Sequence, residues 1–562
     1  MKKSIIFLLL ILFFIMSLSV VSADTNKNLN ISVFTMQKGE QPPSNNKTYK
    51  WIKKKFGVTF TWDILAGDKE EKIALLIRTQ KLPDLVEVDS DKFQNAGCLR
   101  DLKPLIEAYA PNLKKHYASV WKKMIYIDSE KDADGKIVKE HIYSLPKYGA
   151  LDGAPSDTYF NQSAWWIQKA VLKEFGYPVI KTVDQYFDLI EAYYKKHPTI
   201  DGMQTIPFNI ITADWEAFDL WNPPNYLAGY SNDGNGHVDF KNGKYVYKDN
   251  FTDENAKRWF KLANKYFNKG LIDPASFTDN RDQYYTKIAQ GRVLGMFIQG
   301  WQFKGEPELI LYADGKEERT YVPLPLTFDE SIKPYYRDQP LPYLQNGYGI
   351  TTNCTEEKAI KILQFMDKML EEENQRVLYW GFEGEDWQKD KDGRPYRTDR
   401  QRAQQNDPTW ILKNRAKFWE VEAPKLEGTM PSGYTCVIND LPWEYAASQK
   451  KLDLEIFKAY GVNSYAELID KNPPKNAGWY PLWQCNPSEG NGGFEKEAAI
   501  AMKGFEPIQK WYLPKMIMCK PSDFEKTWAE YAELMKPLTN VYNKFMQQQL
   551  DVRVELFGGL QE

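Results

Sequence analysis

Histidine and cysteine are scarce in this chain, and their scarcity limits its chemistry. The sequence contains four histidines and five scattered cysteines, with no Cys-x-x-Cys pair. Histidine is the side chain that most readily exchanges a proton near neutral pH and a frequent zinc ligand, so His-based catalysis and zinc binding have little material here. An odd number of cysteines fits no complete disulfide framework, and we expect unpaired, buried thiols.

Several signatures of enzymes and of nucleic-acid binding are also missing. The sequence has no Gly-x-Ser-x-Gly, P-loop or His-Glu-x-x-His motif. Its formal net charge is −3, and no basic block stands out, so nucleic acid is not an expected partner. Beyond the N-terminal region, no segment is long and apolar enough to cross a membrane.

The N-terminus has the pattern of a secretory signal peptide over residues 1–23. Lys2 and Lys3 form a basic start, an apolar run follows, and small residues lead up to Ala23. No cysteine stands at the expected cut, so we expect a mature chain that begins at Asp24 and carries no lipid. The alternative is an uncleaved anchor, because the apolar stretch approaches the minimum length of a membrane span, about 17 residues.

Aromatic residues, by contrast, are abundant. Phe, Trp and Tyr make up 14% of the chain, including 18 Trp and 34 Tyr. Flat rings pack on the C–H faces of sugars, and Tyr and Trp add a polar handle. Most rings of a folded protein lie in its core, so only their placement can identify those that bind a ligand.

The first part of the chain alternates between predicted strands and helices. We predict strands at 29–36, 58–65 and 85–88, separated by helices at 47–56 and 68–79. Gly57 ends the first of these helices. This order predicts a parallel, doubly wound sheet with ligands at the carboxyl ends of its strands.

The alternation restarts after a hairpin-like region at 135–146. We predict helices at 163–175, 182–197, 251–269, 282–290 and 356–380, strands at 293–298 and 349–352, and a helical tail over about 494–550. Thr182 and Gln185 have the spacing of a capping box. Two α/β units with one return to the first predict two lobes around a cleft.

Six sequence blocks, in order, make the chain resemble extracellular solute-binding proteins, the capture subunits of ABC importers. The blocks are LPDLV with LKPLI and YAPNL (82–113), GKI with YSLP (135–146), WIQKAVLKEFGYPVIKT (166–182), GRVLGMFIQGW (291–301), GYGIT (347–351) and LYWGFEGEDW (378–387). The long branch of the family-1 type, from oligosaccharide importers, fits best. The resemblance runs from about residue 30 to the end and is weakest over 390–500.

The resemblance implies an α/β, two-lobed periplasmic-binding-protein-like fold of type II. It would have two doubly wound sheets, a ligand cleft at the hinge and a helical C-terminal region. We expect lobe 1 to comprise 24–147 and about 340–375, and lobe 2 to comprise 148–339 and about 376–562. The implied partners are an oligosaccharide and the transmembrane permease subunits, and a monomer is expected.

Candidate ligand-binding residues follow from strand ends and from the resemblance. Asp91 and Lys92 follow the third strand, where relatives hold sugar hydroxyls. Trp301 follows a buried strand and Gly300, a position that serves relatives as a sugar-stacking platform. Further candidates are Trp380, Glu383 and Trp387 in one glycine-rich loop, and Tyr159, Asn161, Trp215 and Tyr348. For each, a structural role in the core or on a solvated surface is the alternative.

No metal or other cofactor is predicted. Many long-branch relatives carry a calcium loop after the second-lobe helix, but here that segment has one carboxylate, Asp201, and Ca²⁺ takes several oxygen ligands. The segment Glu130-x-Asp132-x-Asp134-Gly135 begins like a calcium loop, yet its twelfth position is His141. We interpret it as a solvated turn.

The function implied is capture of an extracellular oligosaccharide, with closure of the hinge when sugar binds. A secreted glycoside hydrolase is an alternative, because acidic residues are plentiful and such enzymes need two carboxylates across one bond. A sugar-sensing binding subunit is a second alternative, since it would share the fold and the site.

Overall fold

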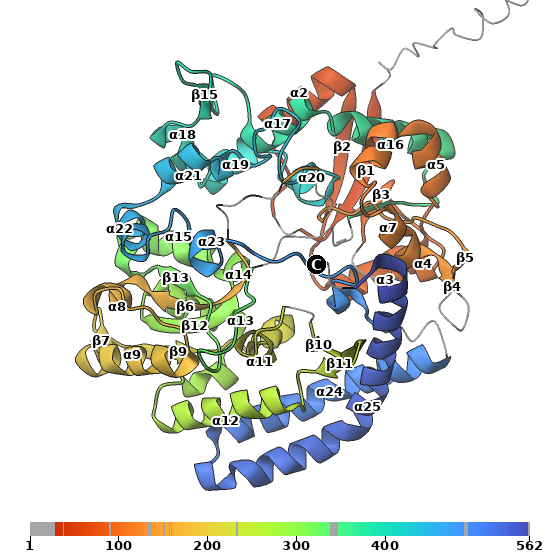
Figure 1. Cartoon of the computed structure of the whole chain (residues 1–562). Coiled ribbons are helices and arrows are strands. Elements are labelled where there is room, and N and C mark those ends of the chain that lie inside the picture. The colour runs from red at the N-terminus through yellow and green to blue at the C-terminus, as the bar shows by residue number, and fades with distance from the viewer. Residues whose placement is uncertain are drawn as a thin grey trace, which may run out of the picture. The chain divides into compact units, whose positions relative to one another are not determined.

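The computed structural model describes residues 28–37, 39–88, 92–131, 137–149, 152–154, 156, 158, 160–231, 234–337, 347–487 and 493–559. The predicted signal peptide and Asp24 lie outside these residues. The chain folds into two compact units, which Figure 1 shows with their elements labelled. Unit 1 comprises Met1–Asp132, Lys136–Tyr148 and Leu344–Leu426, and unit 2 comprises Ala133–Gly135, Gly149–Tyr343 and Glu427–Glu562.

Unit 1 is built on a four-stranded sheet. Its strand order is β14 (Tyr348–Ile350), β3 (Leu85–Glu87), β1 (Leu29–Thr35) and β2 (Val58–Ile64). The first three strands in sequence are mutually parallel, as predicted, and β14 is antiparallel to β3. The helices of unit 1 are α2 (Lys47–Phe56), α3 (Lys69–Thr79), α4 (Lys92–Asn95), α5 (Lys103–Tyr109), α6 (Pro111–His116), α7 (Trp121–Asp128), α16 (Glu356–Met369), α17 (Glu372–Trp380), α18 (Asp399–Gln404), α19 (Pro408–Asn414) and α20 (Lys417–Glu422).

The last return of the chain to unit 1 extends further than we expected. Residues 376–426 belong to this unit, which corrects the expectation that they lie in lobe 2. Trp419 of α20 is fully buried, and its ring lies 5.1 Å from those of both Phe60 in β2 and Phe365 in α16. Aromatic packing against the sheet therefore ties this segment to unit 1. Two short hairpins complete the unit, β4 (Glu130–Lys131) with β5 (Ile137–Lys139) and β15 (Gln388–Lys389) with β16 (Pro395–Tyr396).

Unit 2 has a mixed four-stranded sheet. Its order is β13 (Tyr321–Leu324), β6 (Ser163–Gln168), β12 (Val293–Gln299) and β9 (Ile206–Asn209). β12 is parallel to β9, and β6 is antiparallel to both of its neighbours. All six residues of β6 are buried, as in a strand that is covered on both faces. The predicted helix over 163–175 was therefore wrong for its first six residues, and only α8 (Lys169–Glu174) is helical.

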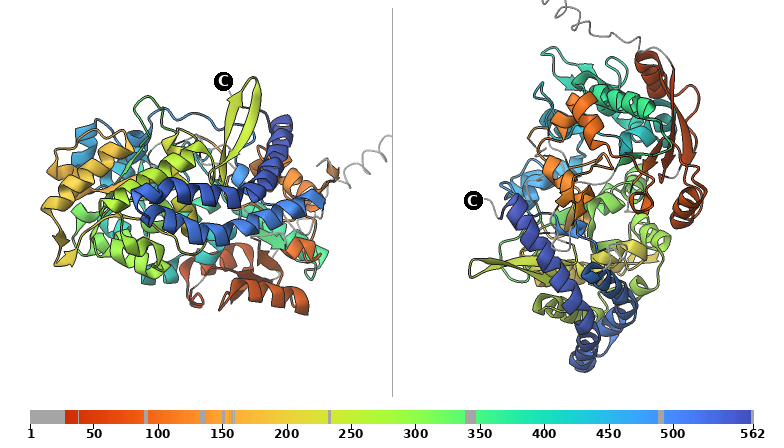
Figure 2. Two further views of the ribbon diagram at one scale, coloured as in Figure 1. Left: turned by 90° about the horizontal axis from the view of Figure 1, so that it is seen from below. Right: turned by 90° about the vertical axis from the view of Figure 1, so that its right-hand side faces the viewer.

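Helices and hairpins cover this sheet and extend the unit. The longer helices are α9 (Val183–Lys196), α12 (Glu254–Asn268), α13 (Arg281–Ala289), α15 (Glu306–Ala313), α22 (Lys451–Tyr460), α24 (Gly493–Met518) and α25 (Phe524–Phe557). The shorter ones are α10 (Phe218–Trp221), α11 (Pro223–Leu227), α14 (Gly300–Phe303), α21 (Pro442–Ser448) and α23 (Tyr465–Ile469). The helical tail is confirmed, and α12, α24 and α25 lie side by side (Figure 1). The hairpin of β10 (Gly236–Lys241) and β11 (Lys244–Asp249) projects from the unit (Figure 2), and β7 (Thr199–Ile200) pairs with β8 (Met203–Gln204).

In the described part of the chain, no helix is both long and apolar enough to span a membrane.

Candidate functional site

Two exposed tryptophans stack on each other at one edge of the unit 2 sheet. Trp301 is the second residue of α14, which directly follows β12, and Trp215 lies in the 3₁₀ helix Asp214–Ala217 that follows β9. Because β9 and β12 are parallel neighbours, their carboxyl ends share one edge of the sheet. The two indoles are parallel within 1°, their centroids are 5.7 Å apart, and they are 59% (Trp215) and 47% (Trp301) exposed. We call this pair the indole platform.

A buried polar network fixes the two segments that carry the platform. Gln302, next to Trp301, donates hydrogen bonds from Nε2 to Asp219 Oδ2 at 2.9 Å and to Glu216 Oε1 at 3.3 Å. Glu216 also accepts hydrogen bonds from Arg281 Nε at 2.7 Å and from the Tyr285 hydroxyl at 2.8 Å. Glu216 and Asp219 are both buried. Since each bond joins α14 or α13 to the segment around Trp215, the network holds together the two segments that carry the indoles.

Burial also sets the charge of this network. Desolvation raises the pKa of Asp219 well above its ordinary value, and the nearby negative charge of Glu216 raises it further. Desolvation is also the main cause that raises the pKa of Tyr285, to which its hydrogen bond to Glu216 adds. Glu216 and Asp219 are therefore buried groups that stabilise the platform through their hydrogen bonds to Gln302.

Gly300 permits the close approach that brings Trp301 to this edge. A Cβ atom added to Gly300 would lie 2.9 Å from Asn161 Oδ1 and 3.0 Å from Asn161 Cα. The Asn161 carbonyl accepts a hydrogen bond from the Trp301 backbone N–H at 3.2 Å. Nearby, Lys304 Nζ donates to the Phe160 carbonyl at 2.9 Å, and burial lowers the pKa of Lys304 to about 8. Asn161 thus contacts the backbone that positions Trp301.

The spacing of the indoles decides how they can contact a flat ligand. A ring inserted between them would need about 7–8 Å, twice the optimum carbon–carbon contact of about 3.5–4.0 Å. The observed 5.7 Å is too small, so the pair offers its outer surfaces as one broad apolar patch. Such a patch suits the C–H face of a sugar ring.

The tryptophans of the glycine-rich loop in unit 1 lie in the core, which corrects the expectation that they stack on sugar. Trp380 is fully buried and Trp387 nearly so, and their rings meet edge to face at 5.1 Å and 86°. The Trp387 indole donates to the Gly381 carbonyl at 3.2 Å, and Arg397 donates to the Trp380 carbonyl at 3.1 Å. The loop packs on its own aromatic rings, and exposed Glu383 forms an ion pair with Lys389 at 2.9 Å.

The remaining predicted residues are dispersed or lie outside the described residues. Tyr348 is a core residue of β14, where its hydroxyl donates to the Phe418 carbonyl at 3.0 Å, so its expected contact with ligand is corrected as well. Lys92 is exposed and forms an ion pair with Glu70. Asp91 and Tyr159 lie outside the described residues.

Sequence reasoning missed a buried charge cluster at the carboxyl edge of the unit 1 sheet. Lys147 Nζ contacts the Glu422 carboxylate at 2.8 and 3.0 Å, and Gln37 Nε2 donates to Glu422 Oε1 at 3.0 Å. Glu87, at the end of β3, accepts hydrogen bonds from the Met36 N–H and the Thr35 hydroxyl at 2.6 and 3.0 Å. Burial, aided by the charge of Glu422, raises the pKa of Glu87 to about 7. The signal in the sequence that could have indicated this cluster is Met36-Gln37 at the carboxyl end of a predicted strand. Nothing near these residues in the sequence indicates Glu422, which lies 385 residues further along the chain.

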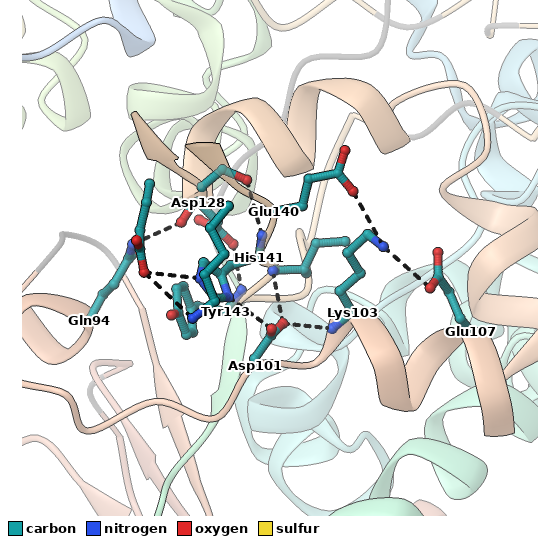
Figure 3. A network of polar contacts seen from close by, with 12 residues as sticks. Gln94, Asp101, Lys103, Glu107, Asp128, Glu140, His141 and Tyr143 are labelled. Atoms are coloured by element: carbon teal, nitrogen blue, oxygen red, sulfur yellow. Dashed lines mark hydrogen bonds and ion pairs between the residues drawn. The ribbon is translucent and has the colours of Figure 1, made fainter. Parts of the chain in front are cut away.

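Glu130 and His141, the first and twelfth positions of the segment that begins like a calcium loop, lie in a polar network of unit 1 (Figure 3). His141 is buried, with Nδ1 2.8 Å from Asp101 Oδ2 and Nε2 3.3 Å from Glu130 Oε1. Asp128 accepts a hydrogen bond from the Tyr143 N–H at 2.6 Å, and Asp101 accepts one from the Lys103 N–H at 3.0 Å. These contacts tie the β4–β5 hairpin to α5 and α7, while Asp132 and Asp134 lie outside the described residues.

The place where relatives carry a calcium loop is a tight hairpin turn in this chain. Asp201 and Gly202 join β7 to β8 with positive φ angles of 50° and 76°. The Asp201 carboxylate pairs with Lys316 Nζ at 2.9 Å, which holds its pKa below the ordinary value. A single carboxylate that is already paired with a lysine does not fit Ca²⁺. Among the described residues, no group of three or more His, Cys, Asp or Glu side chains could hold a metal ion.

Comparison with solved structures defines the class of fold. A substrate-binding protein of an ABC transporter, FusA of Streptococcus pneumoniae in complex with kestose, superimposes with a TM-score of 0.61 at 19% identity, over 94% of this chain and 99% of that one. A human-milk-oligosaccharide (HMO) binding solute-binding protein from Bifidobacterium longum infantis gives 0.63 at 17% identity, over 93% and 98%. The alginate-binding protein AlgQ2 without calcium gives 0.59 at 16% identity, over 94% and 99%. The chain therefore has the fold of ABC-transporter solute-binding proteins, as its sequence resemblance implied.

Sequence comparison gives one particular relative. The fructooligosaccharide ABC transporter substrate-binding protein FusA of S. pneumoniae is 29% identical over 277 residues, which are 46% of this chain and 48% of that protein. The match thus spans about half the length of this curated relative. No family model matches the chain.

Proposed function

We propose that this protein is the substrate-binding subunit of an ABC transporter and captures an oligosaccharide outside the membrane. The observation that carries the proposal is the indole platform, in which two exposed parallel rings are held in place by a buried network. Two large apolar rings exposed to water at the edge of a sheet are unfavourable in free energy unless a ligand covers them. The fold and the sequence match to a fructooligosaccharide-binding relative support the same function.

The other parts of the proposal follow from the resemblance. Sugar would shift the population of the two units toward a closed arrangement, which a membrane permease would then recognise. Export by the signal peptide at 1–23 and a monomeric state belong to the same proposal. A glycoside hydrolase needs two carboxyl groups across the scissile bond, whereas Glu216 and Asp219, the buried carboxylates that support the platform, are engaged with Gln302.

The first test is binding to a panel of neutral and acidic oligosaccharides, followed by calorimetric titration and an assay for hydrolysis. Saturation at 100 times the Kd should raise the free energy of unfolding by about 2.7 kcal/mol. Binding without turnover supports the proposal. Turnover of the bound sugar, or failure to bind any member of the panel, contradicts it.

The second test removes one ring of the platform. We expect Trp301→Ala to weaken sugar binding at least about thirtyfold. Truncating an aromatic ring that becomes buried in a complex costs about 2 kcal/mol of binding free energy, and each 1.4 kcal/mol changes the affinity about tenfold. The ligand-free melting temperature should change little, since nearly half of the Trp301 surface is already exposed. Trp215→Ala should behave alike.

Trp511→Ala is the matched control, because it removes an indole on α24 that is 69% exposed and carries no role in the platform. It should leave affinity unchanged. If Trp301→Ala instead melts much earlier and still binds sugar normally, Trp301 is a structural residue.

A further inference from the structure

One lysine links the helix that carries Trp301 to the segment that enters β6. Lys304 directly follows the last residue of α14, three positions after Trp301, and its side chain is partly buried. Its Nζ donates a hydrogen bond to the Phe160 carbonyl at 2.9 Å. The same ammonium group lies over the ring of Trp166 in β6, 4.7 Å from the ring centroid.

The Phe160 carbonyl belongs to a segment that is bonded directly to the platform. The carbonyls of the two residues after Phe160 accept hydrogen bonds from the N–H groups of Trp301 and Gly300, at 3.2 and 3.0 Å. Lys304 therefore holds the residue next to the two that fix the start of α14. Loss of its hydrogen bond would free this segment at one end and loosen the backbone at Trp301.

The second contact of the ammonium group, the Trp166 ring, also positions the turn after β12. The Trp166 indole N–H donates to the Ile298 carbonyl at 2.8 Å, one residue before the end of β12. The Trp166 ring meets Phe303 of α14 edge to face, at 4.9 Å and 74°. Because a cation is attracted to the face of an aromatic ring, the Lys304 charge links β6 and α14 on either side of this turn.

The charged groups around Lys304 belong to three other helices. Burial is the largest influence and lowers the pKa of Lys304 to about 8. Against it, the carboxylates of Glu308 in α15 and Asp453 in α22 favour the charged form through space, while Lys169 in α8 disfavours it. Lys169 Nζ lies 2.6 Å from Asp453 Oδ1 and donates to the Tyr312 hydroxyl at 3.2 Å, so these groups are engaged with one another.

A lysine in this environment does not serve the stability of the fold. Its ordinary pKa is 10.5, so between about pH 8 and 10.5 the unfolded chain binds more protons than the folded protein. The free energy of unfolding therefore rises with pH across this range, and the charged side chain is destabilising at neutral pH. Methionine has a similar length and no charge to desolvate, so packing and stability alone favour it at this position.

We infer that Lys304 is a positioning residue for sugar binding, whose charged form holds the Phe160 segment and the Trp166 ring against α14 and so keeps Trp301 in the indole platform. The inference rests on the proposed function. A charged donor makes a stronger hydrogen bond than a neutral amine, and only the charged form is attracted to the ring. Loss of the proton should therefore loosen Trp301 and weaken sugar binding at alkaline pH.

The first measurement needs no sugar. The protein is labelled with 5-fluorotryptophan, and the fluorine NMR signal of Trp301 is identified by its loss in Trp301→Phe. We expect this signal to shift as the pH is raised from about 6.5 to about 9.5, with a midpoint near pH 8. In Lys304→Met and Lys304→Arg it should not titrate, because methionine carries no charge and arginine keeps its charge throughout this range. A signal that is constant in the unchanged protein, or that titrates equally in both variants, overturns the inference.

Calorimetric titration then measures the effect on affinity, with kestose, nystose, maltotetraose, cellotetraose and xylotetraose as the probes. For a probe that binds at pH 7, the affinity of the unchanged protein should fall at least about threefold by pH 9.5. Lys304→Met should already bind at least about threefold more weakly at pH 7 and show no further fall. Lys304→Arg should bind without the fall, and Lys173→Met, which removes an exposed lysine of α8, should behave like the unchanged protein.

Thermal melting excludes a general effect on folding. Lys304→Met should melt at the same temperature as the unchanged protein or higher, so that affinity and stability change in opposite directions. Equal affinities of Lys304→Met and the unchanged protein at pH 7 overturn the inference and leave the proposed function intact. If Lys304→Met does not fold, Lys304→Arg decides, since an alkaline fall in affinity equal to that of the unchanged protein contradicts a role for the Lys304 charge. If no probe binds the unchanged protein, the proposed function is contradicted, while the fluorine signal still shows whether Lys304 positions Trp301.

Discussion

At the scale of single residues, the environment decides what a tryptophan does. Trp301 and Trp380 both occur in sequence blocks that resemble the same family, yet one is half exposed and the other is fully buried. Trp301 follows β12 and Gly300 and is exposed at the sheet edge, whereas Trp380 ends α17 and its ring packs edge to face against Trp387. Glu87 shows the same dependence, because its unusual proton affinity comes from burial beside Glu422.

The raised pKa of Glu87 predicts a pH-dependent stability. The folded state binds the Glu87 proton with a pKa of about 7, against an ordinary value of 4.5, so the folded protein holds more protons between these values. Stability from this group is therefore full below about pH 4.5, falls as pH rises toward 7, and is constant above that. The loss should be on the order of 3 kcal/mol, because one pKa unit corresponds to about 1.4 kcal/mol.

Urea unfolding of the unchanged protein and of Glu87→Gln at pH 5 and pH 8 measures this contribution. The variant cannot ionise at this position, so the difference in stability between the two pH values should shrink by that amount. Glu40→Gln, which changes an exposed glutamate, is the control and should retain the full difference. An unchanged pH dependence in Glu87→Gln would assign the effect to other groups.

At the scale of elements, periodicity and end signals predicted many of the longer helices and mistook one central strand for a helix. α2 begins and ends where the sequence indicates, with Gly57 in the left-handed conformation, and Thr182 with Gln185 forms the predicted capping box. The expected helix at 356–380 is two helices, α16 and α17. The strand β6 was mistaken for a helix because a strand buried on both faces has no alternation to reveal it.

The turn between β12 and α14 is packed so closely that we expect a larger residue at Gly300 to be unfavourable. Gly300→Ala should destabilise the protein by about 1–3 kcal/mol, because the added methyl group would overlap Asn161 and contact Trp166 Cζ2 at 3.1 Å. It should also weaken sugar binding by displacing Trp301. Chemical denaturation and titration of the variant measure both effects.

The double variant Asn161→Ala/Gly300→Ala separates this overlap from a general effect of alanine. Removal of the Asn161 side chain relieves the contact with Oδ1, so the second substitution should cost less in this background than alone. Equal costs in both backgrounds would show that Asn161 is not the obstacle.

At the scale of the whole molecule, the chain has the solute-binding fold with a local change where relatives carry calcium. The turn at Asp201-Gly202 pairs its carboxylate with Lys316, and the two side chains are partly exposed. An ion pair of this kind contributes only about 0–1 kcal/mol. The fold at this point is therefore maintained by the hairpin β7–β8 and by the core beneath it.

This arrangement predicts that stability does not depend on calcium. The melting temperature of the purified protein should be the same in excess calcium and in excess chelator, because Asp201 lacks the further oxygen ligands that Ca²⁺ takes. Differential scanning calorimetry under both conditions is the measurement. A large drop in chelator would reveal a metal site, and Asp201→Asn would then show whether this turn holds it.

The sequence by itself determined the class of fold and singled out Trp301 as a candidate ligand-binding residue. Three features of the sequence carried these predictions: the strand–helix alternation, the six ordered blocks and the strand–Gly–Trp pattern at 293–301. Each depends on residues that are close together in the chain, so a local pattern of residues is enough to reveal it. Only the tertiary structure decided that Trp215 joins Trp301, that Trp380, Trp387 and Tyr348 belong to the core, and that Glu422 lies beside Lys147. Burial and pairing of these residues depend on contacts between distant segments, which no local pattern of residues encodes.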